Sequence, residues 1–306
     1  MIGTRYSIFS RDEWAALRSN TPLTLSADEL LALRGINQQV SLDEVADIYL
    51  PLSRLLNLHV AAARGLDRVK DIFLGRLSGR SPYIIAIAGS VAVGKSCFAR
   101  VLQAVLARWP DHPRVALVTT DGFLHPNSVL EAHGLMQRKG FPESYDLGRL
   151  VQFLTAVKSG EAAVEAPVYS HLTYDIVPDR SEVIERPDIL IFEGLNVLQP
   201  GASAARLPSD FFDFSVYLDA EEADIEAWFM NRFRLLQQTA FQDPASYFYR
   251  YRDVAAEAAI AFAAAAWRDI NLANLHENIL PTRERADLVL RKRADHAVGE
   301  IWLRRG

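Results

Sequence analysis

Short apolar runs separated by helical patterns mark the middle of the chain. Four such runs occupy residues 83–88, 115–120, 189–192 and 214–218. Each has the length and composition of a strand that is buried on both faces. Apolar positions in residues 98–109 recur with helical spacing, and Pro110 ends this helix. Strands that alternate with helices predict an α/β fold, with a mostly parallel central sheet and helices on both of its faces.

The first eighty residues are expected to be helical. Ser26 with Glu29, and Ser41 with Glu44, fit the S-x-x-E capping box. After Pro51, apolar residues recur every three or four positions, which predicts one long amphipathic helix packed through that face. The positions on this face are Leu52, Leu55, Leu56, Val60, Ala63, Leu66, Val69, Phe73 and Leu77.

Beyond Asp219 the pattern again predicts helices, including the stretch after Ala294. The run AAIAFAAAAW at residues 258–267 is interpreted as an alanine-rich buried helix, because it falls short of the roughly 18 apolar residues that a membrane span needs. The first ten residues do not have the pattern of a signal peptide. We therefore expect a cytoplasmic protein without a membrane anchor.

Composition and charge narrow the class of protein. Apolar residues make up 50% of the chain and charged residues 23%, the mix of an ordinary globular protein rather than a disordered or fibrous one. Lys and Arg number 33 against 38 Asp and Glu, a net charge of −5, so the chain lacks the positive field of a nucleic-acid binder. One cysteine permits no intrachain disulfide.

A phosphate-binding motif follows the first apolar run. The sequence GSVAVGKS fits G-x-x-x-x-G-K-[ST] at every defined position. Its glycines let successive backbone N–H groups converge on phosphate oxygens, at the positive end of the following helix. We expect the lysine to reach the β- and γ-phosphates and the serine hydroxyl to ligate Mg²⁺. The predicted ATP-binding residues are Gly89, Ser90, Val91, Ala92, Val93, Gly94, Lys95 and Ser96.

Two carboxylates directly follow buried strands. Asp121 ends the second apolar run and Glu193 the third, and each precedes a glycine. Ligands of open parallel sheets bind beyond the carboxyl ends of the strands. There a carboxylate can accept a proton from an attacking hydroxyl or hold metal-bound water. A helix cap or a loop-fixing hydrogen bond is the structural alternative for each.

The segment YSHLTYD lies between the two acids in the sequence. Alternation in an extended segment would place Tyr169 and His171 on one face. Neutral His and Tyr side chains suit recognition of a small polar acceptor, although a histidine in this setting can equally be structural.

Several segments together resemble those of bacterial type I pantothenate kinases, within the P-loop kinase group that includes uridine kinase and phosphoribulokinase. They are GSVAVGKS from Gly89, TTDGFLHPN from Thr119, GFPESYD from Gly140, PVYSHLTYD from Pro167, DILIFEGLNVLQ from Asp188 and NILPTRERA from Asn278. The resemblance runs from about Asp43 to Arg304. It implies one P-loop kinase domain over 1–306, with a helical extension at 1–80, a nucleotide-binding core at 81–220 and a helical acceptor and lid part at 221–306.

The resemblance implies an activity and a set of site residues. It implies ATP-dependent phosphorylation of pantothenate at its primary hydroxyl, the first committed step towards coenzyme A, in a homodimer that coenzyme A inhibits. Asp121 would activate the hydroxyl, Lys95 and Arg232 would neutralise transferred charge, and Ser96 and Glu193 would serve Mg²⁺. Pantothenate would contact Asp121, Tyr169, His171, Tyr174, Arg232 and Asn271. Coenzyme A would contact Lys95, Arg100, His171, Phe233, Phe241, Phe248 and Tyr251.

Three positions depart from the family pattern. Cys97 stands where threonine is frequent, Phe229 stands where tyrosine is usual, and Leu236 stands where a bulkier residue is usual. A lost hydroxyl that bonds substrate could weaken binding by about 0.5–1.5 kcal/mol.

Two alternative functions stay open: a related small-molecule kinase acting on uridine or a ribulose phosphate, and a nucleotide switch. No N-K-x-D motif for guanine is present.

Overall fold

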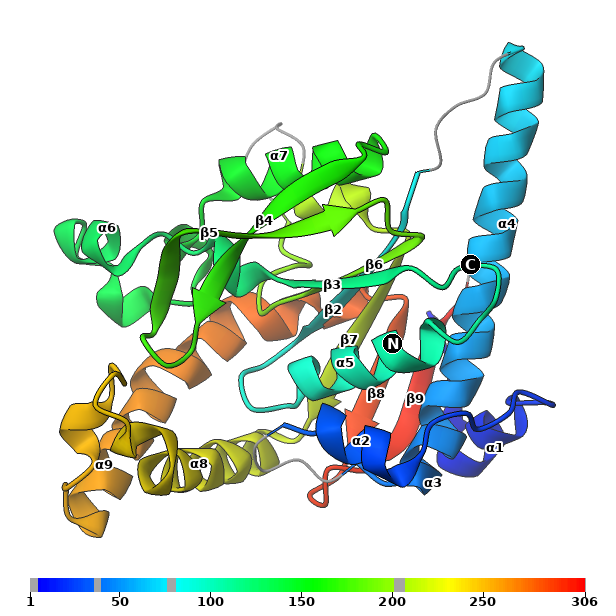
Figure 1. Cartoon of the computed structure of the whole chain (residues 1–306). Helices are drawn as coiled ribbons and strands as arrows, with labels where there is room; N and C mark the ends of the chain where they lie inside the picture. Colours follow the sequence, from blue (N-terminus) through cyan, green and yellow to red (C-terminus); the bar gives the residue numbers. More distant parts are fainter. Residues whose placement is uncertain (1–4, 36–39, 76–80, 201–206, 306) are drawn as a thin grey trace.

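The computed structural model describes residues 5–35, 40–75, 81–200 and 207–305. A seven-stranded sheet of order β1-β9-β8-β7-β2-β6-β3 forms its centre (Figure 1). The five strands from β8 to β3 are parallel, while β9 and β1 add an antiparallel edge. The strands are β1 (Tyr6–Ser10), β2 (Tyr83–Gly89), β3 (Val115–Thr119), β6 (Ile189–Glu193), β7 (Phe214–Ala220), β8 (Leu288–Lys292) and β9 (Val298–Arg304).

Helices and turns connect these strands. The α-helices are α1 (Arg11–Ala16), α2 (Ala27–Leu33), α3 (Leu42–Glu44), α4 (Leu50–Leu74), α5 (Lys95–Leu106), α6 (Asn127–Ala132), α7 (Leu147–Lys158), α8 (Glu222–Gln238) and α9 (Ala256–Ala266). Wider π-helical turns occupy Val45–Tyr49, Trp267–Leu272 and Leu275–Ile279. A separate antiparallel hairpin consists of β4 (Ala163–Ser170) and β5 (Asp175–Glu185). In this described part of the chain, no helix is long and apolar enough to cross a membrane.

Helices cover both faces of the sheet, as the sequence predicts. Phe214 pairs in register with Ile85, and Phe192 pairs with Ala86, so the two rings point to opposite faces. The ring of His59 in α4 lies 5.2 Å from Phe214, whereas the ring of Phe153 in α7 lies 6.2 Å from Phe192. All four predicted strands are present, and every residue of β2 is buried, which confirms the α/β prediction.

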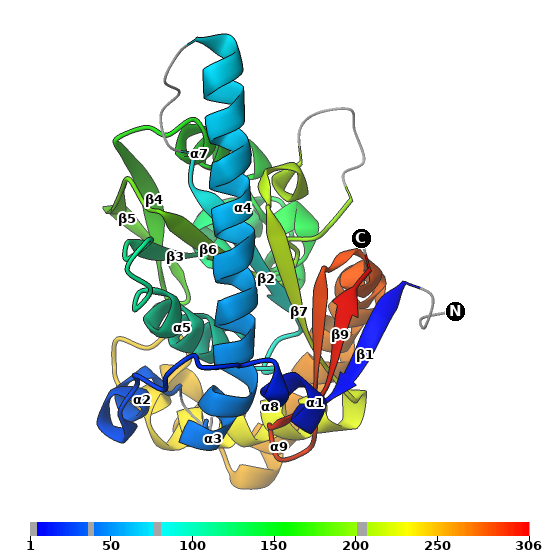
Figure 2. The ribbon, with the colours of Figure 1, turned by 90° about the vertical axis from the view of Figure 1, so that its right-hand side faces the viewer.

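The ends of the chain differ from the expected all-helical pattern. β1 lies in the segment predicted to be helical, and it pairs with β9. β8 and β9 occupy the C-terminal stretch, where we expected helices. β1 is the edge strand and only Tyr6 of its five residues is buried, so its apolar pattern is broken. Figure 2 shows these terminal strands side by side at one edge of the sheet.

One of the two predicted capping boxes is complete. Ser26 and Glu29 exchange both hydrogen bonds at the start of α2. Ser41 caps Glu44, but the Glu44 carboxylate instead accepts from the backbone N–H of Val298 at 2.9 Å and from Arg11. The expected reciprocal bond is therefore wrong, because a long-range strand captures the carboxylate.

The long helix after Pro51 is confirmed as α4, but its apolar face is buried only in the first half. Leu52, Leu56 and Val60 are buried, whereas Val69 is 61% and Phe73 86% exposed. The last turns extend away from the other elements in Figures 1 and 2. The predicted packing of that half is absent in a single chain. Leu77 lies outside the described residues.

The alanine-rich run does form a helix, α9, but it is only partly buried. Ala259 and Ala263 are buried, while Ile260 and Phe262 are more than a third exposed. The expectation of a buried helix is therefore wrong for its outer face. The buried alanines instead pack in a cluster with Phe233 of α8 and with Phe241, which follows α8.

Candidate active site

The register of three parallel strands brings the predicted site segments to one edge of the sheet. β6 lies between β2 and β3, and Glu193 pairs with Ile87 on one side and with Thr119 on the other. The phosphate loop begins two residues after Ile87, and Asp121 follows Thr119 by two residues. Glu193 therefore lies between the phosphate loop and Asp121, as the strand-end pattern predicts.

The phosphate loop has a backbone that its small residues make possible. Gly89 has φ of +141°, and a Cβ there would lie 2.6 Å from the Leu218 carbonyl oxygen. Gly94, at φ +99°, begins α5, whose first N–H groups face the loop. The buried Ser90 hydroxyl has no partner among the described residues. This loop thus offers unused donors at a helix N-terminus, the arrangement that binds phosphate.

The Lys95 side chain lies against this loop. Its Nζ donates to the Ser90 carbonyl oxygen at 2.8 Å. Burial lowers the Lys95 pKa to about 8, against the opposing charges of Glu193 and Asp121. An anion bound in the loop would offset the cost of burying the ammonium group, so the side chain favours a negatively charged ligand.

Two glycines allow the acids to stand close together. A Cβ on Gly122 would lie 2.1 Å from the Pro167 carbonyl oxygen, and one on Gly194 would lie 2.1 Å from the Thr120 hydroxyl oxygen. Gly122 thus lets the turn that carries Asp121 contact β4, and Gly194 lets the end of β6 contact the same turn. At both positions the glycine permits a close contact rather than leaving open space around the acid.

The charged side chains of Glu193, Lys95, Arg232 and Asp121 act on one another at this edge of the sheet. Glu193 is buried, and one of its carboxylate oxygens has no partner in the described part. Burial raises the Glu193 pKa, and Lys95 and the Ser96 hydroxyl oppose that shift. Burial lowers the Arg232 pKa, and the charges of Asp121 and Glu193 oppose it. The structure thus brings Arg232, predicted from α8, to both strand-end acids.

The β4–β5 hairpin carries the three predicted acceptor side chains. The Tyr169 ring lies 5.2 Å from the His171 ring and 6.4 Å from the Tyr174 ring. β4 ends at Ser170, so His171 stands in the turn and not in the extended segment that we expected. Burial of the His171 ring lowers its pKa, while Asp121 raises it. The Asp121 charge also raises the pKa of Tyr174, after burial, to about 12.

Asn271 lies in the C-terminal helical segment, in the π-helical turn Trp267–Leu272. Its amide donates to the Ala266 carbonyl oxygen at 3.1 Å. One turn later, Asn274 donates to the Gly140 carbonyl oxygen at 2.8 Å, which fixes this segment against the loop that follows β3. The hydrogen bond of Asn271 lies within its own helical segment, so its role at the site stays a prediction.

The four predicted aromatic residues form one cluster. Phe233 and Phe241 are buried in it, and the Phe241 ring stacks on Phe248 at 5.0 Å. Phe248 is 6.3 Å from Tyr251 and 5.0 Å from Tyr174 of the hairpin. An apolar surface thus continues directly from the acceptor side chains.

Comparisons with known proteins agree with this geometry. The sequence profile of the Phosphoribulokinase / Uridine kinase family matches residues 84–232. A pantothenate kinase of Sorangium cellulosum is 61% identical over 99% of this chain and 98% of its own length. One of Escherichia coli O1:K1 / APEC is 56% identical over 99% of this chain and 97% of its own. The chain belongs to the pantothenate kinase family.

The fold is shared more widely than the sequence. The solved structure of the YGR205w protein superposes with a TM-score of 0.53 at 14% identity, and covers 80% of this chain and 98% of that one. This likeness shows a shared fold alone. The family assignment rests on the full-length relatives.

The positions that depart from the pantothenate kinase pattern pack in the structure without strain. Phe229 lies 5.7 Å from Trp267, and Leu236 packs on the aromatic cluster. Cys97 is buried in the first turn of α5. Arg100 donates to the Leu33 carbonyl oxygen at 2.9 Å, and this hydrogen bond links α5 to the end of α2.

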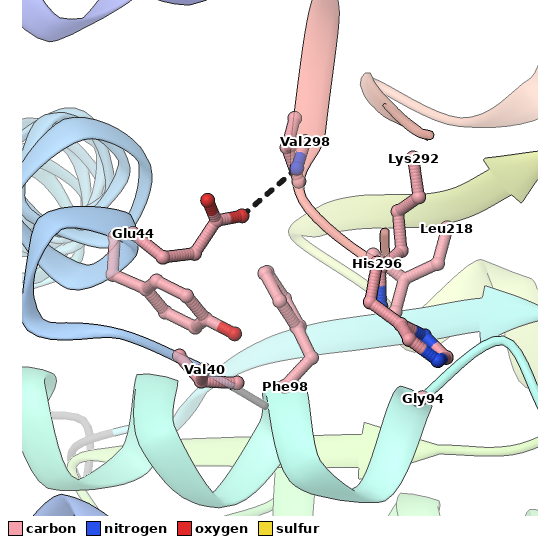
Figure 3. Close-up of a pocket in the computed structure, with 9 residues that line it drawn as sticks. Val40, Glu44, Gly94, Phe98, Leu218, Lys292, His296 and Val298 are labelled. Atoms are coloured by element: carbon pink, nitrogen blue, oxygen red, sulfur yellow. Dashed lines mark hydrogen bonds between the residues drawn. The ribbon is translucent and has the colours of Figure 1, made fainter. Parts of the chain in front are cut away.

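Sequence reasoning missed Lys292, which supports the phosphate loop from β8. Its Nζ donates to the Val93 carbonyl oxygen at 3.0 Å, and burial lowers its pKa to about 8. A cavity of about 20 Å³ beside it is lined by Glu44, Phe98 and His296, as Figure 3 shows. His296 stacks on Trp228 at 4.1 Å. Residues from both ends of the chain therefore line this cavity beside the phosphate loop.

Three residues near the acceptor hairpin were also not predicted from the sequence: Lys139, Asn127 and Tyr145. Lys139 is buried, and its Nζ lies 4.0 Å from the Tyr174 ring centroid. Tyr145 is buried near Asp121, whose charge adds to burial in raising its pKa. The segment GFPESYD carried a signal only through the family resemblance.

Proposed function

We propose that this protein transfers the γ-phosphoryl group of ATP to the primary hydroxyl of pantothenate and forms 4′-phosphopantothenate, the first committed step of coenzyme A synthesis. One observation carries the proposal: Glu193 is paired in register between the strand that leads to the phosphate loop and the strand that leads to Asp121. Full-length similarity to pantothenate kinases supports this acceptor over others.

The residues present fit a nucleoside triphosphate. The partnerless Ser90 hydroxyl, the Gly94 N-terminus of α5 and the depressed pKa of Lys95 all favour an anion in the loop. The loop N–H groups would hold the phosphate chain, and Lys95 would contact the β- and γ-phosphates. Arg232, from α8, would add positive charge on the acceptor side.

The donor set also fits Mg²⁺. The Ser96 hydroxyl and the free Glu193 carboxylate oxygen lie together at the strand end. No group of three or more His, Cys, Asp or Glu side chains that could hold a metal occurs within the described ranges. Mg²⁺ commonly takes one or two protein oxygens and completes its shell with water and substrate phosphates. Bound there, the ion would neutralise charge on the transferring phosphoryl group.

Asp121 would act on the acceptor alcohol. It follows β3 at the site edge, and its charge contributes, after burial, to the raised pKa of Tyr169 and of Tyr174, so it acts on the acceptor side chains. The carboxylate would orient the hydroxyl and take its proton late in the transfer. Tyr169 and Tyr174 would stay protonated and so remain hydrogen-bond donors to the acceptor.

A panel assay tests the reaction. ADP release is measured with ATP and Mg²⁺ in the presence of pantothenate, uridine or ribulose 5-phosphate, and in the absence of any acceptor. We expect turnover with pantothenate only, and a product of the mass of phosphopantothenate. Turnover with uridine or the ribulose phosphate would identify a related kinase instead, and acceptor-independent turnover would identify a nucleotide switch.

Coenzyme A inhibition is part of the proposal. The aromatic cluster begins at Phe248, in contact with Tyr174, and so could receive a pantetheine arm while the phosphates compete for Lys95. Arg100 and His171 would contact the inhibitor's phosphate end. We expect Phe241→Ala to raise the inhibitory concentration of coenzyme A and leave product inhibition by ADP unchanged. Equal effects on both inhibitors would argue against this binding mode.

We also propose a homodimer formed through the end of α4. Leu66, Val69 and Phe73 follow the spacing of a coiled-coil seam and are each more than half exposed. A second copy of the same helix can cover this seam by symmetry.

Light scattering checks the dimer. The double variant V69E/F73E should have the mass of one chain where the unmodified protein has the mass of two. L31E places the same charge on α2, where Leu31 is 62% exposed, and should stay dimeric. A double variant that keeps the mass of two chains would move the interface elsewhere.

A further inference from the structure

Tyr174 holds an uncommon backbone conformation at the end of the acceptor turn. Its φ is +53°, in the left-handed region that bulky residues rarely adopt. Such a conformation persists only where the surrounding structure imposes it. Since Tyr174 precedes β5 directly, this one angle sets how the turn of residues 171–174 presents its side chains.

Two donors from a different part of the chain hold this residue. The Tyr174 carbonyl oxygen accepts from Asn127 Nδ2 at 3.0 Å and from Lys139 Nζ at 2.5 Å. Lys139 also donates to Asn127 Oδ1 at 2.6 Å, so the three groups close a ring. The Asn127 N–H donates to Asp175 Oδ1 at 3.0 Å, which secures the next residue of the hairpin.

The same ammonium group also orients the rings. Lys139 Nζ lies 4.0 Å from the ring centroid of Tyr174 and 5.2 Å from that of Tyr169. An ammonium over an aromatic face is attracted to it most strongly where water is excluded, and Lys139 is only 8% exposed. One charge thus acts on the backbone of one acceptor tyrosine and on the rings of two.

Asn127 and Lys139, which we call the clamp, belong to the segment that follows Asp121. Asn127 starts α6, and Lys139 precedes Gly140, whose carbonyl oxygen accepts from Asn196 and Asn274. Lys139 therefore adjoins a residue that two side chains from other parts of the chain hold in place, which helps it to impose the strained angle on the hairpin.

We propose that Lys139 and Asn127 are positioning residues that hold Tyr174, and through it the acceptor turn, in the conformation that receives the alcohol substrate. The inference rests on the proposed kinase function but not on the identity of the acceptor. Neither residue needs to touch the reacting atoms, because each acts through the Tyr174 carbonyl group. The Asp121 and Asp175 carboxylates face the ammonium and keep it charged against the cost of burial.

Steady-state kinetics of Lys139→Met test the clamp. The variant keeps the side-chain length and removes the charge and both hydrogen bonds that Lys139 donates, to the Tyr174 carbonyl oxygen and to Asn127 Oδ1. We expect the KM for the acceptor to rise at least about tenfold, the loss typical of a charge-assisted hydrogen bond, with the KM for ATP within about twofold of the unmodified value. Lys139→Arg keeps the charge and should recover part of the acceptor affinity.

Lys158→Met is the matched control. Lys158 pairs with Asp213 and donates to the Pro82 carbonyl oxygen at 3.1 Å, beside the start of β2 and 13 residues before the acceptor turn of residues 171–174. It should leave both KM values unchanged. Asn127→Asp removes the amide donor and keeps the acceptor to Lys139, and it should raise the acceptor KM by a smaller factor. This second variant decides the matter if Lys139→Met fails to fold.

The acceptor used is whichever one the unmodified protein phosphorylates best in the panel. Failure with pantothenate therefore contradicts the proposed function alone. The clamp is wrong if both clamp variants keep the acceptor KM within twofold of the control, or if the KM values for ATP and acceptor rise together.

Discussion

Lys292 Nζ and the carbonyl oxygen of Val93 are hydrogen-bonded at 3.0 Å, across 199 residues of sequence. The bond links β8 to the phosphate loop two residues before Lys95. Lys292 also lies over the Trp228 ring at 5.6 Å, so it is held on both sides. The conformation of the nucleotide loop thus depends on a strand near the end of the chain.

Lys292→Met should weaken ATP binding more than folding. Loss of a charge-assisted bond to the loop predicts a rise in the KM for ATP of roughly tenfold, with the acceptor KM little changed. Initial-rate kinetics give both values, and thermal unfolding reports stability. An unchanged KM for ATP would show that the loop keeps its shape without this bond.

Asp121→Asn should reduce kcat by at least about a hundredfold, because an amide cannot take the proton of the acceptor alcohol. ATP affinity, measured by calorimetry, should stay near that of the unmodified protein, since the phosphate loop is untouched. Asp111→Asn, at an exposed position on the loop after α5, is the matched control. Near-normal turnover in the Asp121 variant would remove this residue from the mechanism.

The sequence predicts those parts of the site that depend on contiguous residues. The continuous apolar runs define β2, β3 and β6, and an acid after each of two strands follows directly from the chain. Parallel pairing then brings Glu193 beside Thr119 without further information. The phosphate loop is likewise a contiguous motif.

The rest depends on partners distant in sequence. Glu44 leaves its expected cap because Val298 lies beside it, 254 residues away in the chain. Lys139 becomes part of the acceptor site only because the hairpin returns to it 35 residues later. The exposed half of α4 has the same pattern as the buried half, since periodicity does not reveal which surface a neighbour covers.

Lys95 predicts a pH dependence of nucleotide capture. Burial lowers its pKa from 10.5 to about 8, so the free enzyme has the ammonium form below about pH 8 and loses it as the pH rises further. The kcat/KM for ATP, which reports the free enzyme, should therefore fall above roughly pH 8.

Saturating ATP should hold the proton on Lys95, so kcat should fall less than kcat/KM over the same range. Initial rates between about pH 6.5 and 9.5, in buffers of constant ionic strength, measure both parameters. The pKa of Lys292 is lowered to a similar value. The Lys292→Met variant should therefore still show the fall in kcat/KM for ATP that Lys95 causes. A kcat/KM for ATP that is flat to the highest pH would contradict the assignment.

Gly194→Ala should damage both folding and activity. The added Cβ would lie 2.1 Å from the Thr120 hydroxyl oxygen and 2.6 Å from its methyl carbon, at a packed contact between the ends of β6 and β3. Displacing that turn costs stability by about 1–3 kcal/mol, the range for overpacking, and moves Asp121 relative to Glu193. Denaturant unfolding and kcat measure the two effects.

Gly65→Ala provides the opposite case. Gly65 lies inside α4, and a Cβ there would meet nothing within 4 Å. Alanine should therefore stabilise the protein by up to about 1 kcal/mol through helix propensity, with kcat unchanged. If Gly194→Ala were as stable and active as Gly65→Ala, the close approach of the two strand ends would not be what positions the acids.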